Sequence, residues 1–417
     1  MASKKTDIIV YAHWLGIPKP IKMGVLSAQK ARGHLSWSFA YEKQWLHTKS
    51  QIQLDPDLQW FAGPQYGPEG KPNFGLFMDS MPDTWGRTLM NKREALLHSK
   101  AGERRKLNDI DYLLGVYDPA RMGGLRFKLD ENGPFLDDHK NKAIPPMANI
   151  RELQYGADLM ESDKDTEAVR KWLQILLAPG SSLGGARPKS SVVDKNGELW
   201  IAKFPSRKDT TDIGAWEYVA WQLAKNAGIE VPESKVENVT GRHHTFFSKR
   251  FDRTAEKRIH FASAMTTTGH FERQIRDHSP SYLELAEFIQ FHSASPKSDL
   301  KQLWRRIVFN IAISNTDDHL RNHGFLMSNK GWRLSPAFDM NPTTDKAGLA
   351  LNIDLEFNEL DFELARSVGT YFQLSSKQMD QIIEEVQSSV ASWEELAREI
   401  GIPSAQRRIM ENAFHFS

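Results

Sequence analysis

Residues 314–324 read SNTDDHLRNHG and concentrate side chains that can do chemistry. From Asp317 to His323 there are two carboxylates, two imidazoles and one side-chain amide. Carboxylates and imidazoles can transfer protons, and carboxylate and amide oxygens can bind hard cations such as Mg²⁺. The same residue types are common in turns, where they form local hydrogen bonds. The string therefore indicates either a catalytic loop or a well-capped turn.

Asp317 and Asn322 have the spacing of a protein-kinase catalytic loop, with four residues between them. In kinases this aspartate accepts the proton of the acceptor hydroxyl, and the asparagine binds magnesium. Asp339 lies 17 residues beyond Asn322, after a predicted short hairpin, where kinases carry a metal-binding aspartate. A metal hydrolase is the alternative, and its ligands would be Asp317, His319, His323 and Asp339.

A loop of small residues, 181–189, lies upstream of this string. Gly184 and Gly185 would let backbone N–H groups approach phosphate oxygens, and Lys189 would add a positive charge. The loop is not a Walker A sequence, and two neighbouring glycines are also typical of a plain turn. The pattern therefore favours a phosphate-binding loop only in combination with other features.

Lys203 is the next charged residue that the pattern singles out, because it lies between apolar residues on a predicted strand. A kinase uses such a strand lysine to bind the α- and β-phosphates and to pair with a helix glutamate. Glu217, on the following predicted helix, is the candidate partner; an edge lysine and a solvated glutamate are the structural alternatives. These features occur in the order in which a kinase has them: the glycine loop, the strand lysine, the helix glutamate, the Asp-x4-Asn pair, the hairpin and the second aspartate.

Hydrophobic periodicity predicts the elements that position these residues. Alternation over 35–41 indicates a strand, and Asn196-Gly197 between two β-prone runs indicates a hairpin. A helix over 213–227 should end at Gly228. Four further helices are predicted over 83–99, with Asp83 as N-cap, and over 165–177, 300–311 and 379–390. Another helix should begin at the capping box formed by Ser281 and Glu284. A short hairpin is predicted over 324–334.

Strands that precede helices indicate an α+β protein with a sheet lobe and a helical lobe. The chain has 417 residues, no cysteine, and 54 Lys and Arg against 53 Asp and Glu. This composition excludes disulfides and cysteine-bound metals, and it argues against a chain that coats nucleic acid. We find no apolar stretch of 18 residues, so we expect a cytoplasmic protein without a membrane partner.

The chain resembles the HipA toxin kinases of bacterial type II toxin–antitoxin systems. The motifs that carry the resemblance are SLGGARPK at 182–189, SKRFDR at 248–253, NTDDHLRNH at 315–323, PAFD at 336–339, and MPDTWGR and MGGLRF at 81–87 and 122–127. The resemblance implies a two-lobed, kinase-like α+β fold whose N-terminal lobe has a mixed sheet and an added subdomain. It places this subdomain at 1–145, the rest of the N-lobe at 146–254 and the mainly helical C-lobe at 255–417.

The resemblance also implies a role for each matching residue. Asp317 would accept the proton, Asn322 and Asp339 would hold Mg²⁺, and Lys203 would contact the phosphates of ATP. The implied catalytic set is Asp317, Asn322, Asp339 and Lys203. The implied ATP-binding residues are Gly184, Gly185, Ala186, Arg187, Pro188, Lys189, Lys203, Lys249, Arg250, Phe251, His319, Leu320, Arg321, Asn322, Phe338 and Asp339.

The family's activity would be ATP-dependent phosphorylation of serine or threonine in a protein. In the best-known members the target is glutamyl-tRNA synthetase, which links the kinase to growth arrest and persistence. A serine of the phosphate loop is autophosphorylated in the family, here Ser182, with Ser181 adjacent to it. A HipB-like helix-turn-helix antitoxin would bridge the toxin to operator DNA. A catalytically silent partner of that complex and a small-molecule phosphotransferase are the alternatives.

Overall fold

The computed structural model describes residues 5–31, 34–48, 52–98, 105–139, 144–162, 172, 176, 185–254, 256–276 and 279–416. The chain divides into two compact units. The first consists of Met1–Ile201 and Asp252–Phe271, and the second of Ala202–Phe251 and Glu272–Ser417. The three-part division expected from the sequence stays a prediction.

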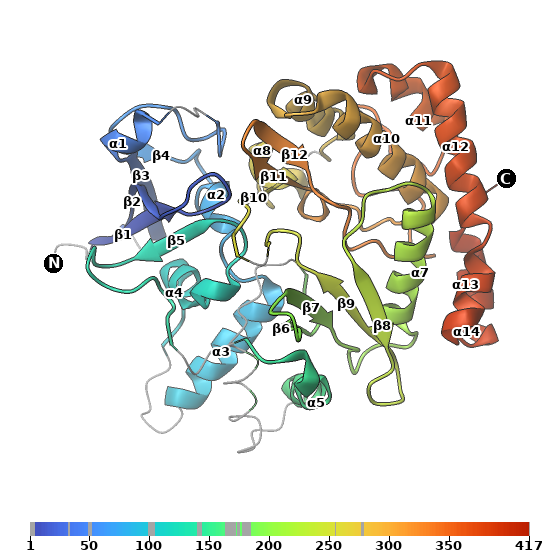
Figure 1. Ribbon diagram of the computed structural model, residues 1–417, viewed down its shortest axis with the longest axis horizontal. Helices are drawn as coiled ribbons and strands as arrows, with labels where there is room; N and C mark the ends of the chain where they lie inside the picture. Colours follow the sequence, from blue (N-terminus) through green and yellow to red (C-terminus); the bar gives the residue numbers. More distant parts are fainter. Residues whose placement is uncertain are drawn as a thin grey trace. The chain divides into compact units, whose positions relative to one another are not determined.

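The first unit is built around an antiparallel sheet with the strand order β4-β3-β2-β1-β5 (Figure 1). The strand predicted over 35–41 is confirmed as β3, and its alternating residues Trp37, Phe39 and Tyr41 are buried. The strands are β1 Lys5–Ala12, β2 Ile21–Ala31, β3 His34–Tyr41, β4 Gln65–Tyr66 and β5 Leu125–Lys128.

Short helices complete the described part of this unit. They are α1 Lys43–Leu46, α2 Gly75–Met78, α3 Thr84–His98, α4 Asp109–Gly115, η1 Asp118–Ala120, η3 Met147–Asn149, α5 Ile150–Glu161 and α8 Ala264–Thr267. The predicted helix over 83–99 is confirmed as α3, and Asp83 Oδ1 accepts a hydrogen bond from Gly86 N at 2.7 Å, as an N-cap does. The helix predicted over 165–177 lies largely outside the described residues.

The Asn-Gly hairpin is also confirmed, because β6 Lys189–Val193 and β7 Leu199–Lys203 are neighbours in a sheet and flank that turn. The end of β7, Ala202 and Lys203, belongs to the second unit, and β9 Thr245–Lys249 and then β8 Ser234–Glu237 follow β7 in the sheet order. Figure 1 shows α7, Ile213–Asn226, lying along β8 and β9, against which it packs. Strand β10, Phe261–Ser263, belongs to the first unit.

The rest of the second unit is mainly helical. Its elements are η4 Gln274–Arg276, α9 Tyr282–His292, α10 Pro296–Ala312, η5 Leu320–Asn322, β11 Gly324–Ser328, β12 Gly331–Leu334, α11 Phe362–Val368, η6 Gly369–Phe372, α12 Ser376–Val390, α13 Trp393–Ile400, α14 Ser404–Met410 and η7 Glu411–Ala413. The Ser281/Glu284 capping box and the hairpin β11–β12 are confirmed. Among the residues described, no helix is long and apolar enough to cross a membrane.

Helix α10 forms the centre of the helical part, packed against α9 and α12. The periodic residues that predicted it are all buried: Leu300, Leu303, Trp304, Ile307, Val308 and Ile311. The helix ends at Ala312, directly before the string that starts at Ser314. A rigid, buried helix therefore delivers the residues that could do chemistry.

Candidate active site

Lys203 and two carboxylates form the centre of the candidate site in the second unit. The Nζ atom of Lys203 lies 2.5 Å from Oε1 of Glu217 and 2.6 Å from Oδ1 of Asp339. The three side chains are only 15, 6 and 30 % exposed, respectively. The structure thus brings together a strand lysine, a helix glutamate and the aspartate that follows β12, three residues singled out from the sequence.

The pKa of Lys203 reflects this cluster. Burial alone would lower the pKa of the ammonium group, but Asp339 and Glu217 outweigh that effect and raise it above its usual value. Lys203 is therefore charged throughout the physiological pH range, and it balances one of the two carboxylates.

Helix α7 presents Glu217 because its first turn is fixed against the start of β9. Asp212, the N-cap, accepts hydrogen bonds from Ala215 N and His244 N, and its Oδ2 lies 2.6 Å from Nδ1 of His244. Burial would raise the pKa of Asp212, but these hydrogen bonds, the largest from the His244 ring, lower it below its usual value. A Cβ atom on Gly214 would lie 2.2 Å from His244 O, so only glycine permits this close approach.

The loop after α10 holds Asp317 at its exposed tip. Asp317 is exposed, whereas its neighbours Thr316 and Asp318 are buried. The side-chain amide nitrogen of Asn322 donates to the carbonyl oxygen of Asp317 at 2.9 Å, so the two residues with the kinase spacing are directly connected. An exposed carboxylate on a fixed backbone can accept a proton from a second molecule.

Asp318 and His323 anchor this loop through their buried side chains, a role that the sequence did not indicate. Oδ1 of Asp318 and Nε2 of His323 lie 2.5 Å apart, and both side chains are almost fully buried. The His323 ring also packs edge-to-face on Tyr282, at 5.5 Å. The i,i+5 spacing of this pair was visible in the string, but only the fold shows that the two side chains point inward.

This burial bears on the metal-hydrolase alternative. The structure does not bring Asp317, His319, His323 and Asp339 together as one ligand set. The only group of three such side chains within ligand reach, among the residues described, is Asp137, Asp138 and His139 in the first unit. The Nε2 atom of His323 instead forms a hydrogen bond with Oδ1 of Asp318.

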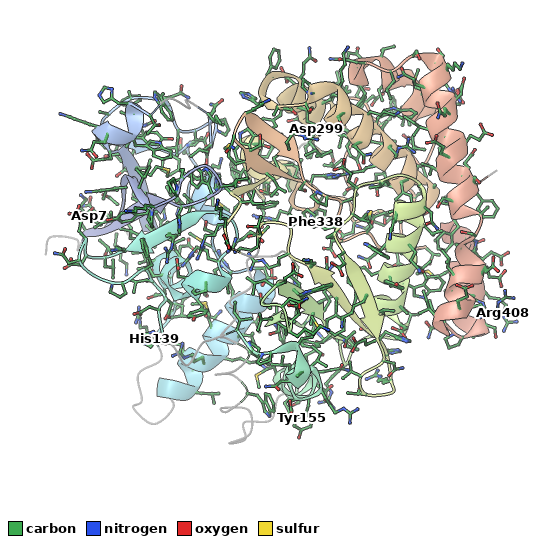
Figure 2. The ribbon with its side chains drawn as sticks, viewed as in Figure 1. Asp7, His139, Tyr155, Asp299, Phe338 and Arg408 are labelled. Atoms are coloured by element: carbon green, nitrogen blue, oxygen red, sulfur yellow. The ribbon has the colours of Figure 1, made fainter. Side chains whose placement is uncertain are left out.

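Asp339 has a backbone conformation that few non-glycine residues adopt, with φ of +59°. Such strain persists only where the surroundings fix it, and it is frequent at functional sites. Lys203 provides one constraint, and the preceding residue provides another: the ring of Phe338, labelled in Figure 2, lies 5.4 Å from that of Phe251. Phe251 is one of the residues that the family resemblance implies for ATP binding.

The other residues expected to bind ATP lie in varied surroundings. Lys249 N, at the end of β9, donates to the carbonyl oxygen of Glu233, the residue before β8, at 2.8 Å, and Arg250 is buried. Arg321 donates to Oε1 of Glu272 at 3.2 Å, and Leu320 is buried. His319 is half-buried, and its Nδ1 atom has no partner in the described part of the chain.

The expected phosphate loop is described only from Gly185 onward, because Ser181, Ser182 and Gly184 lie outside the described residues. Gly185 and Ala186 are exposed, Arg187 is half-buried and Pro188 is buried. This loop belongs to the first unit.

Lys189 differs from the picture of a cation that points at phosphate. Its side chain is 3 % exposed, and its Nζ lies 2.8 Å from Oδ2 of Asp83 and 3.3 Å from Gly185 O. The indole nitrogen of Trp85 donates to Lys189 O at 3.0 Å. The motif that contains Asp83 and Trp85 therefore fixes the end of the loop.

Residues 181–393 match the model of a family described as HipA-like C-terminal domain. The relative named "Putative kinase Y4mE", from Sinorhizobium fredii, is 23 % identical over 405 residues, which cover 90 % of this chain and 84 % of the relative. The serine/threonine-protein kinase CtkA of Helicobacter pylori is 25 % identical over 169 residues, or 39 % of this chain and 51 % of CtkA.

Among solved structures, the chain is similar to HipA from Shewanella oneidensis MR-1, determined with HipB and its operator DNA. The TM-score is 0.63 at 16 % identity, and the match covers 97 % of this chain and 94 % of that one. This likeness concerns the fold, and it confirms the predicted fold class, a HipA-type, kinase-like α+β fold.

Proposed function

Because the chain belongs to the family of HipA-like C-terminal domains, we propose that it is an ATP-dependent serine/threonine protein kinase. The observation that carries this proposal is the bridge from Lys203 to both Glu217 and Asp339. In protein kinases the strand lysine pairs with a helix glutamate and contacts the α- and β-phosphates, while the aspartate after the hairpin holds magnesium. The kinase-named relatives support the same activity.

Magnesium fits the residues present. Mg²⁺ prefers hard oxygen ligands and keeps several waters, so one or two side chains suffice. Asp339 provides a carboxylate, and Asn322 provides an amide oxygen whose orientation is set by its hydrogen bond to Asp317 O. When bound, the metal would neutralise charge on the phosphate oxygens. Within this chain, Lys203 holds the carboxylate of Asp339 in position, and the exposed carboxylate of Asp317 is available to the acceptor hydroxyl.

The transfer step then needs one proton acceptor. The hydroxyl oxygen of the acceptor serine or threonine forms a bond to the γ-phosphorus, and the bond from that phosphorus to the β,γ-bridging oxygen breaks. ADP leaves, and the hydroxyl proton passes to the exposed carboxylate of Asp317. A positioned base of this kind typically contributes about 10²–10⁴-fold to the rate.

We infer from the family that this kinase acts as the toxin of a type II module. The HipA to which the chain is similar was determined with HipB and operator DNA, which supports a helix-turn-helix antitoxin as partner and DNA contact through it. A translation-related protein, with glutamyl-tRNA synthetase as the first candidate, would be the substrate. Ser182, or its neighbour Ser181, would be the site of autophosphorylation.

The test is an in vitro kinase assay on the full chain. Wild-type protein and Asp317→Asn are incubated with labelled ATP and Mg²⁺, alone and with glutamyl-tRNA synthetase, and ATP binding is measured by calorimetry. We expect transfer by the wild type only, and ATP binding by both. Binding of ATP by the wild type without transfer to itself or to protein would contradict the proposal and leave a silent partner of the antitoxin. Transfer to a small alcohol alone would favour a small-molecule phosphotransferase.

A further inference from the structure

A short segment that follows α14, residues 413–416, contacts two regions next to the candidate active site. One is Trp216, the residue before Glu217, and the other is the end of α10 with Ser314, which leads into the loop of Asp317. We call residues 413–416 the latch segment. It is formed by Ala413, Phe414, His415 and Phe416, of which the first two are buried and His415 is half-buried. All its contacts described below lie within the second unit.

Phe414 seats the latch segment on aromatic rings. Its ring stacks on Trp393 of α13 with 4.5 Å between centroids and 7° between planes, and it lies 6.1 Å from the ring of Trp216. Trp216 is 1 % exposed and directly precedes Glu217 on α7. Residues adjacent on a helix point about 100° apart, so the face that packs on the latch segment also fixes the direction of Glu217.

His415 connects the same segment to the start of the catalytic loop. Its backbone N–H donates to the carbonyl oxygen of Ala312, the last residue of α10, at 2.7 Å. Its ring nitrogen Nε2 lies 2.9 Å from the hydroxyl oxygen of Ser314, a hydrogen bond whose direction depends on the tautomer. The latch segment thus binds both the end of the helix and the first turn of the loop.

Ser314 is the joint at which the loop turns away from α10. Its φ of +48° lies in the left-handed region, which a serine adopts only when its surroundings enforce it. Its carbonyl oxygen accepts hydrogen bonds from Thr316 N at 2.8 Å and from Thr343 N at 3.3 Å. Thr316 directly precedes Asp317, and Thr343 lies four residues after Asp339. The carbonyl group of Ser314 therefore holds both the loop of Asp317 and the segment that follows Asp339.

We propose that His415 is a positioning residue of the kinase: through Ser314 it holds Asp317 and the segment after Asp339 in their working geometry. This inference rests on the proposed function for its rate effect, but the contacts that carry it are independent of that function. His415 touches neither substrate nor metal in this scheme. It acts by holding Ser314 in its left-handed backbone conformation, which the loop would otherwise leave.

The variants are His415→Ala, His415→Gln, Ser314→Ala and the double variant His415→Ala/Ser314→Ala. We expect His415→Ala to lower kcat about fivefold, the equivalent of one ordinary hydrogen bond, with KM for ATP within twofold of wild type. His415→Gln keeps a polar group at the ε position and should restore most of kcat. Ser314→Ala should match His415→Ala, and the double variant should lose no more than either alone.

His292→Ala is the matched control, because His292 is also a partly buried histidine of the second unit and stacks on Phe288 at 4.8 Å. Amide hydrogen exchange of the peptide 314–322 provides a readout besides activity. We expect faster exchange there in His415→Ala, and wild-type exchange in the control.

The two proposals fail differently. If the wild type transfers no phosphate, the proposed function fails, and hydrogen exchange alone decides the role of His415. If the wild type is active, unchanged kcat and unchanged exchange in His415→Ala would overturn the positioning role. Equal losses in His415→Ala and His292→Ala would also overturn it, because they would indicate a general effect on folding.

Discussion

Replacing Lys203 by methionine tests the electrostatic centre of the site. Methionine keeps most of the side-chain volume and removes the positive charge that pairs with the carboxylates of Glu217 and Asp339. Removing one partner of a buried ion pair typically costs about 3–5 kcal/mol. Asp339 is 30 % exposed, so water takes over part of its solvation, and we expect a cost near the lower limit, about 3 kcal/mol.

The cost should depend on pH in a direction that the structure fixes. In the wild type the pKa of Lys203 is raised, so its contribution to stability is fully present below the unfolded value of about 10.4 and is lost only as the pH rises through the folded pKa. Between pH 5.5 and 7.5 that contribution is constant. In Lys203→Met the buried Glu217 loses its cation, so its pKa should rise above the unfolded value. Lower pH then protonates it in the folded state and stabilises the variant.

The assay is thermal unfolding at pH 5.5 and 7.5. For a unit of about 200 residues, a loss of about 3 kcal/mol corresponds to a fall in Tm of roughly 6–12 °C. We expect that fall at pH 7.5 and a clearly smaller one at pH 5.5. Adding Glu217→Gln to Lys203→Met should remove the dependence on pH. Lys235→Met is the control, because Lys235 pairs with Glu237 on the exposed surface and should matter little.

A fall in Tm of less than about 2 °C at pH 7.5 would refute the reasoning, since it would mean that water solvates both carboxylates. A large fall of equal size at both pH values would refute it as well. That result would indicate lost packing around the lysine stem rather than an unbalanced charge.

Three further outcomes are expected. Asp317→Asn should abolish phosphoryl transfer and growth arrest but keep ATP binding, and growth arrest by that variant would remove Asp317 from the role of base. Burial raises the pKa of Asp55 to about 6, so the first unit should gain about 1 kcal/mol of stability from pH 7 to pH 5; denaturation of Asp55→Asn should lack that gain. With a formal net charge of +1, the chain alone should bind operator DNA weakly in mobility-shift assays and specifically only with its antitoxin.

Local signals predicted most of the fold. The Asn196-Gly197 hairpin, the Ser281 capping box and the periodicity of α10 depend on residues a few positions apart, so the sequence displays them directly. The kinase-like spacing of Asp317 and Asn322 is a local signal of the same kind. The structure adds a direct hydrogen bond between the two residues.

Contacts between distant residues could not be predicted in this way. Ser314 and His415 are 101 positions apart, and Asp83 and Lys189 are 106 apart. Each pair consists of common polar residues, and no periodicity or motif connects its members. Their meeting depends on how whole helices pack, which is decided by the summed burial of many apolar side chains rather than by the polar residues themselves.

The ion-pair partners of Lys189 and Lys203 favour different roles for the two lysines. Lys189 is buried with the carboxylate of Asp83, and this ion pair holds the end of the loop. Lys203 bridges two carboxylates, those of Glu217 and Asp339. In the proposed kinase, Asp339 would also hold a divalent cation, which would supply positive charge for the polyphosphate of ATP. The ion pair with Lys203 therefore fixes the carboxylate of Asp339, the group that would hold the metal in the proposed kinase, before the nucleotide arrives.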